Sequence, residues 1–331
     1  MAERFKAPVL KTGDGQPSVS SNLTASASAS PFLSSPMRLT SVASRFFLLA
    51  AAAGGAIPVR AMDVSKLWDF SQPAASEARF VAALAGAGSD EQLILKTQIA
   101  RTYGLRGDFA RARQMLNDLE PDMATAGAEA RVRHAIETGR TYVSAAHPAN
   151  LLTSEARQTA ARFFRAAIDQ AQQARLDGLA IDAMHMMAFA EPQPLDQLKW
   201  TLQALSVAEA SDQTAARDWR ASLHNNAGMA LHDLGRLDEA LVHFRRQTVL
   251  RAQAGDAARE RVARWMEAWT LRGLGRIDEA LSAQLQLESE FERAGQVDVY
   301  VFQELEALYR ARGDEARVTH YALLRNRAAG R

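Results

Sequence analysis

The chain has 331 residues, of which 47% are hydrophobic and 23% are charged, with a formal net charge of +1 and no cysteine. The lack of cysteine excludes a disulfide framework, a thiolate nucleophile and a cysteine metal cluster. Alanine, leucine, arginine and glutamine are abundant, prolines are few, and no valine-rich alternating run occurs, so we predict an all-α body.

The beginning of the chain has the features of a leader. Residues 1–36 are rich in Ser, Ala and Thr with little apolar surface to bury, so we predict that they are disordered. From Met37, basic residues precede an apolar run, and Val59-Arg60-Ala61 has the small-x-small pattern of a signal-peptidase site. We therefore predict a signal peptide over 37–61, cleaved after Ala61. Whether translation starts at Met1 or at Met37 stays open.

The apolar run at 46–59 is too short for a membrane span, and glycine and proline interrupt it. A buried helix at the edge of the domain is the alternative interpretation. After cleavage no stable membrane span is expected.

Removing the leader reverses the sign of the net charge. Residues 1–61 hold six Lys/Arg and two Asp/Glu, which leaves 33 basic and 36 acidic side chains, a net charge of −3. Nothing in this remainder resembles the basic stripe that nucleic-acid binding needs, so we expect no nucleic-acid partner.

Residues 62–92 are predicted to cap the fold. Trp68 and Phe70 are expected to pack on the first helical hairpin, because the end of a stacked array must be covered. An amphipathic helix is predicted over Pro73–Leu84. The remainder, 93–331, is predicted to be a helical repeat domain.

Helical hairpins are predicted in succession along this domain. The first spans about 93–119, with its turn at Gly107-Asp108; a degenerate one spans about 178–210, with its turn at 191–194. Between them lies a hairpin with a long connection, whose marker residues are Gly139 and Tyr142 in the first helix and Ala160, Phe164 and Ala167 in the second. A shortened last hairpin contains Leu305, Tyr309, Gly313-Asp314, Ala316 and His320.

One motif occurs twice between Leu223 and Leu281. The eight residues from Leu234 to Leu241 (LGRLDEAL) return forty residues later from Leu274 to Leu281 (LGRIDEAL), with a single exchange. Each glycine can adopt the left-handed conformation that ends a helix, and each Asp-Glu pair suits the first turn of the next helix. Self-similarity at such a spacing is typical of stacked helical hairpins.

Small and apolar residues around the motif resemble the tetratricopeptide repeat. Its pattern is matched by Gly228, Leu231, Ala240 and Phe244, and then by Ala268, Leu271 and Ala280, with Gln284 in place of the aromatic residue. The spacing exceeds the usual 34 residues of that family, so second helices longer by about a turn are expected. The resemblance implies an α-solenoid, a right-handed superhelix of five to six hairpins.

In that family the first helices of successive hairpins line a concave groove that binds ligands. Carried onto this chain, the resemblance selects Asn225, Asn226, Met229, His232, Trp265, Trp269, Arg272, Tyr300, Gln303 and Arg310 as candidate partner-binding residues. Aromatic rings flanked by Asn and Arg can hold an extended peptide. Packing between helices is the alternative for Trp265 and Trp269. A two-carboxylate clamp is disfavoured, because Val262 and Met266 stand where basic residues would be needed.

No catalytic motif with specific spacing is present. Met184-His185-Met186-Met187 could be a Cu(I) site, but we favour a methionine-rich core helix. We therefore predict no enzyme activity, no cofactor and no metal.

The sequence favours a non-catalytic scaffold that binds a protein or peptide partner and is exported to the bacterial envelope, in the periplasm. Two alternatives stay open. One is a cytoplasmic repeat module that senses a ligand, which requires the leader to remain uncleaved. The other is an enzyme on a helical array.

Overall fold

The computed structural model describes residues 63–330, so the predicted disordered segment 1–36 and signal peptide 37–61 lie outside the described residues. Within this range every regular element is helical. In chain order the α-helices are α1 Pro73–Leu84, α2 Ser89–Leu105, α3 Phe109–Leu119, α4 Ala128–Arg140, α5 Ser154–Gln173, α6 Asp177–Ala190, α7 Pro194–Ala210, α8 Thr214–Arg217, α9 Arg220–Asp233, α10 Leu237–Gln253, α11 Ala257–Gly273, α12 Ile277–Arg293, α13 Val299–Ala311 and α14 Glu315–Ala329. Three short 3₁₀ helices accompany them: η1 Val64–Leu67, η2 Glu120–Ala124 and η3 Ala149–Leu151.

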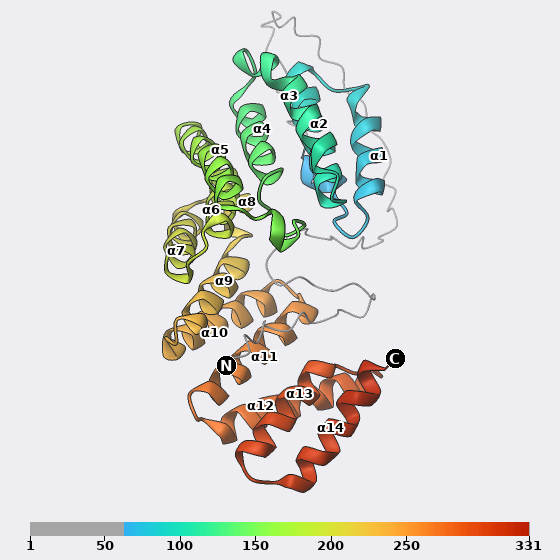
Figure 1. Ribbon diagram of the computed structural model, residues 1–331, viewed down its shortest axis with the longest axis vertical. Helices are drawn as coiled ribbons and strands as arrows, with labels where there is room; N and C mark the ends of the chain where they lie inside the picture. Colours follow the sequence, from blue (N-terminus) through green and yellow to red (C-terminus); the bar gives the residue numbers. More distant parts are fainter. Residues whose placement is uncertain (1–62, 331) are drawn as a thin grey trace, which may run out of the picture.

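The helices pack on one another in chain order, which is consistent with a helical solenoid. In Figure 1 the array bends into an arc, with α5, α7 and α10 along its outer edge and α4 and α11 along its inner edge. We call the surface formed by the first helix of each pair (α2, α4, α6, α9, α11 and α13) the inner face. None of the described helices combines the length and apolar character needed to cross a bilayer.

The predicted hairpin turns are present. Gly107, Gly235, Gly275 and Gly313 all have φ between 72° and 82°, the left-handed region in which a side chain would be strained. In the repeated motif Arg236 folds over its turn and donates two hydrogen bonds of 2.7 Å to Glu239. Arg276 does the same with Glu279. The two copies of the motif therefore have the same local structure.

Two details differ from the prediction. The marker residue Tyr142 lies beyond the end of α4, because the chain turns after Arg140 and the His147 ring folds back onto the carbonyl of Thr141 at 3.1 Å. The short helix α8 before the repeated motif was not predicted. The predicted degenerate hairpin, by contrast, is present as α6 and α7, with the expected turn between them.

The N-terminal segment covers the first hairpin. Trp68 is buried, stacks on Phe70 at 4.6 Å between ring centroids and meets the edge of Phe80 in α1 at 5.0 Å. The helix α1 has the predicted bounds. The aromatic residues thus shield the end of the array from water.

Two hydrophobic clusters make up most of the core. One runs from Val132 to Leu223 and includes Met184, Met186 and Met187, so these methionines fill the core as we favoured. The other runs from Ala227 to Tyr321 and also takes in Leu198 of α7. The two clusters meet where α7 packs on α9.

Candidate functional site

The ten candidate residues lie on α9, α11 and α13, which are the first helices of three successive hairpins. Most of the ten contact another member of the set. Their exposure differs widely. Trp265 is only 3% exposed and Asn225 8%, whereas Arg310 lies at the surface with 60% of its side chain exposed. The others are half-buried. The predicted site is therefore a packed surface with partly exposed side chains.

Three aromatic rings form a stack between α9 and α11. The imidazole of His232 lies on Trp269 with 3.4 Å between ring centroids and 13° between planes, and Trp265 follows at 6.0 Å from Trp269. The indole N–H of Trp265 donates to the backbone carbonyl of Tyr300, at 3.2 Å. Trp265 therefore packs between helices, which was the alternative interpretation of this residue.

Burial in this stack changes the protonation of His232. Desolvation, assisted by the nearby charge of Arg272, lowers the pKa of His232 to about 4. The ring is therefore neutral at physiological pH, and it acts as a flat aromatic surface rather than as a cation.

Two arginines of the site have carboxylate partners on α13. Arg272 donates to both oxygens of Glu304, at 2.5 Å and 3.2 Å, and Glu304 is only 3% exposed. Arg310 donates to Glu306 at 2.7 Å, within the same helix. Arg272 thus joins α11 to α13, while Arg310 keeps much of its guanidinium in water.

The two asparagines connect α9 to α6. Asn225 donates to Asn226 at 3.3 Å, and the Asn226 amide lies 3.2 Å from Nδ1 of His185. His185 belongs to the methionine-rich run considered as a copper site. Among the described residues no group of three or more His, Asp or Glu side chains is placed to hold a metal ion.

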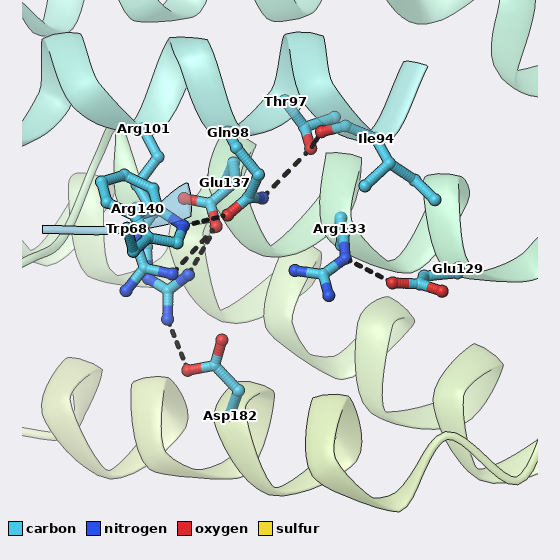
Figure 2. A network of polar contacts seen from close by, with 10 residues as sticks. All are labelled: Trp68, Ile94, Thr97, Gln98, Arg101, Glu129, Arg133, Glu137, Arg140 and Asp182. Atoms are coloured by element: carbon cyan, nitrogen blue, oxygen red, sulfur yellow. Dashed lines mark hydrogen bonds and ion pairs between the residues drawn. The ribbon is translucent and has the colours of Figure 1, made fainter. Parts of the chain in front are cut away.

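A buried network of charged residues on the inner face was not predicted. Figure 2 shows it across α2, α4 and α6. Arg140 lies between two carboxylates and donates to Glu137 at 2.6 Å and to Asp182 at 2.5 Å. Arg101 of α2 lies 3.6 Å from the same Glu137 oxygen. Since no side chain of these four is more than 13% exposed, the network is shielded from solvent.

The network keeps its charges although it is buried. Desolvation alone would raise the pKa of Asp182, but Arg140 and Arg101 outweigh it and hold that pKa below its ordinary value. Desolvation and the neighbouring charge of Arg140 lower the pKa of Arg101 to about 10, which leaves it protonated at neutral pH. Two cations and two anions thus compensate one another.

The capping segment also reaches the inner face. The Trp68 indole donates to Gln98 of α2 at 3.0 Å, and the Arg101 guanidinium lies 5.3 Å from the centre of the Trp68 ring. A segment of the chain itself therefore occupies the inner face at the first hairpin.

A signal in the sequence could have found part of this network. The candidate residues Met229 and Trp269 each follow the small residue of their repeat directly. Ala100 and Gly139 are the small residues of two other hairpins, and the residues that directly follow them are Arg101 and Arg140. Their carboxylate partner Asp182 has no such marker, because α6 lacks a recognisable small residue at that position.

No protein-family model matches this chain, and no curated protein shows significant similarity to it.

Proposed function

We propose that this chain is a tetratricopeptide-like α-solenoid, a right-handed superhelix that binds a protein or peptide partner on its inner face and carries no catalytic activity of its own. The repeated turn supports the proposal, since LGRLDEAL and LGRIDEAL have the same glycine conformation and the same arginine–glutamate contact. The small residue Gly228 against Phe244 supports it as well.

The observation that carries the binding proposal is the chemistry of the inner face between α9 and α13. Half-buried Met229, Trp269 and Gln303 lie there with the exposed head of Arg310. Apolar surface next to amide and guanidinium donors suits an extended peptide, whose backbone needs hydrogen bonds and whose side chains need apolar contact.

Substitutions of Trp265 or Arg272 are poor tests, because both residues also hold helices together. A photo-crosslinking amino acid at position 229 or 303 avoids this problem. In the native host we expect adducts to one partner from these inner positions and none from position 242, where Val242 is 66% exposed on α10. Equal adducts from both faces, or none from the inner face, would contradict the proposal.

We further propose export to the bacterial envelope, on the strength of the apolar run and the small-x-small pattern ending at Ala61. N-terminal sequencing of the protein from its own host tests this. A chain that starts at Met62 in the periplasmic fraction is expected. An intact N-terminal segment in the cytosol would contradict export and favour the cytoplasmic sensing module.

A further inference from the structure

Two histidines meet close to the junction of the two core clusters. His224 lies on α9 beside α7, and His243 lies on α10. Their Nδ1 atoms are 2.9 Å apart, and the ring centroids are 5.0 Å apart. His224 is 9% exposed and His243 is half-buried, so the contact belongs to the packed interior of the array.

The contact requires two different tautomers. A hydrogen bond between two Nδ1 atoms needs a proton on one and a lone pair on the other. Nε2 of His224 lies 3.7 Å from the Glu209 carboxylate of α7, so we assign that nitrogen its proton. His224 then accepts through Nδ1, and His243 donates. This chain of contacts links α7, α9 and α10.

The charged groups around the pair do not compensate the positive charge that a second proton would add. The titratable and charged neighbours are Glu209 from α7, Arg220 from α9, and Glu239 and Arg246 from α10. Burial lowers the pKa of both imidazoles, and burial together with the nearness of His243 lowers that of His224 to about 4. Each carboxylate already lies beside an arginine, Glu209 at 3.7 Å from Arg220 and Glu239 at 2.7 Å from Arg236.

The pair binds protons in two steps, and only the second step breaks the hydrogen bond between the rings. The first proton can bind Nε2 of His243 and leave the hydrogen bond intact, with an imidazolium donating to a neutral ring. The second must bind Nδ1 of His224, the atom that accepts the bond. Two cations with facing N–H groups would then be 2.9 Å apart, so the rings must separate.

We propose that the His224–His243 pair is an acid-operated release for the joint between α9 and α10. At about pH 4 and below, the doubly protonated pair pushes α10 away from α9 and loosens the packing between these two helices. The N-terminal and C-terminal halves of the array then change their relative orientation, while the helices of each half stay folded. For a protein that meets external acid, such a joint alters the shape of the inner face.

The cysteine-free chain suits a distance measurement between its halves. Spin labels at Arg165→Cys on α5 and Gln286→Cys on α12 are both exposed and lie on opposite sides of the joint. Between about pH 7.5 and about pH 4 we expect the distance distribution to shift or broaden by several ångströms. Circular dichroism at each pH should show that helicity is retained.

A matched pair of variants isolates the histidines. His243→Gln keeps a side-chain donor but cannot charge, so its distance distribution should stay the same at both pH values. His320→Gln, on the exposed face of α14, should behave as the parent chain does. His224→Gln serves in place of His243→Gln if that variant does not fold. An unchanged parent distribution, the same acid shift in the glutamine variant, or loss of helicity together with the shift would overturn the proposal.

Discussion

Two glycines, Gly139 and Gly228, show how single residues set the distance between the helices of a hairpin. A methyl group added to Gly228 would lie 2.6 Å from a ring carbon of Phe244, and one added to Gly139 would lie 2.4 Å from Phe164. Both phenylalanines are fully buried. Each ring thus fills the space that the glycine leaves. In the next repeat the equivalent positions hold Ala268 and Gln284. Alanine is larger than the glycine it replaces, and the glutamine opposite it has no aromatic ring.

Gly228→Ala is therefore expected to destabilise the fold by about 1–3 kcal/mol, the usual cost of overpacking a core. Gly104→Ala is the matched control. It lies in a helix with nothing within 4 Å of the added methyl, so alanine should be neutral or stabilising there. Urea denaturation measures both. Equal free energies of unfolding for the two variants would contradict the packing role of Gly228.

At the scale of helices, the inner face is held together by charge as well as by apolar contact. Arg140 links α4 to α6 through Asp182, and Arg272 links α11 to α13 through Glu304. Desolvation makes buried ion pairs expensive, so they add little net stability over an apolar pair. Removing one partner, however, leaves a buried charge uncompensated. We therefore expect these pairs to fix how neighbouring hairpins align.

Asp182→Asn should lower the free energy of unfolding by about 3 kcal/mol, because Arg140 and Arg101 lose an anion. Asp196→Asn is the control, since its ion pair with Lys199 is exposed and worth less than about 1 kcal/mol. Chemical denaturation compares the two variants.

The same carboxylate makes stability depend on pH. The pKa of Asp182 lies below its ordinary value of 3.8 in the folded chain. Its contribution is therefore present above pH 3.8 and is lost as the pH falls through the lower, folded-state pKa. Denaturation curves of the parent and of Asp182→Asn should converge at acid pH. A constant difference between them would show that Asp182 acts by packing alone.

At the scale of the whole molecule, a helical array is stabilised by contacts between neighbouring elements. A whole repeat can therefore be deleted, provided that the helices on either side of the deletion can still pair. The two copies of the repeated motif are forty residues apart. Deleting residues 237–276 joins Arg236 to Ile277 and restores the sequence LGRIDEAL at the junction. The helix α9 would then pair with α12 in place of α10.

This forty-residue deletion is expected to leave a folded, cooperatively melting helical protein. Deleting 237–266 instead joins the turn to the middle of α11, out of register, and should cause loss of helicity and aggregation. Circular dichroism and thermal melting distinguish the two. Equal behaviour of both chains would contradict a modular array.

Local patterns in the sequence were enough to place most helices and turns. Gly235 with its Asp-Glu pair, and Gly228 with Phe244, interact within a single hairpin, so the information for each lies within about 20 residues. The bounds of α1 and the turn at 191–194 were predicted for the same reason. The short helix α8 was missed, because a single turn has no periodicity to detect.

The side-chain partners across hairpins were decided by the tertiary structure alone. Trp265 contacts the carbonyl of Tyr300, and Asp182 meets Arg140, across intervals of 35 and 42 residues. These contacts depend on the angle between successive first helices, which no local pattern encodes. For that reason the sequence could select the inner-face positions by register, whereas only the packed array determined which of them lie in water and which hold the helices together.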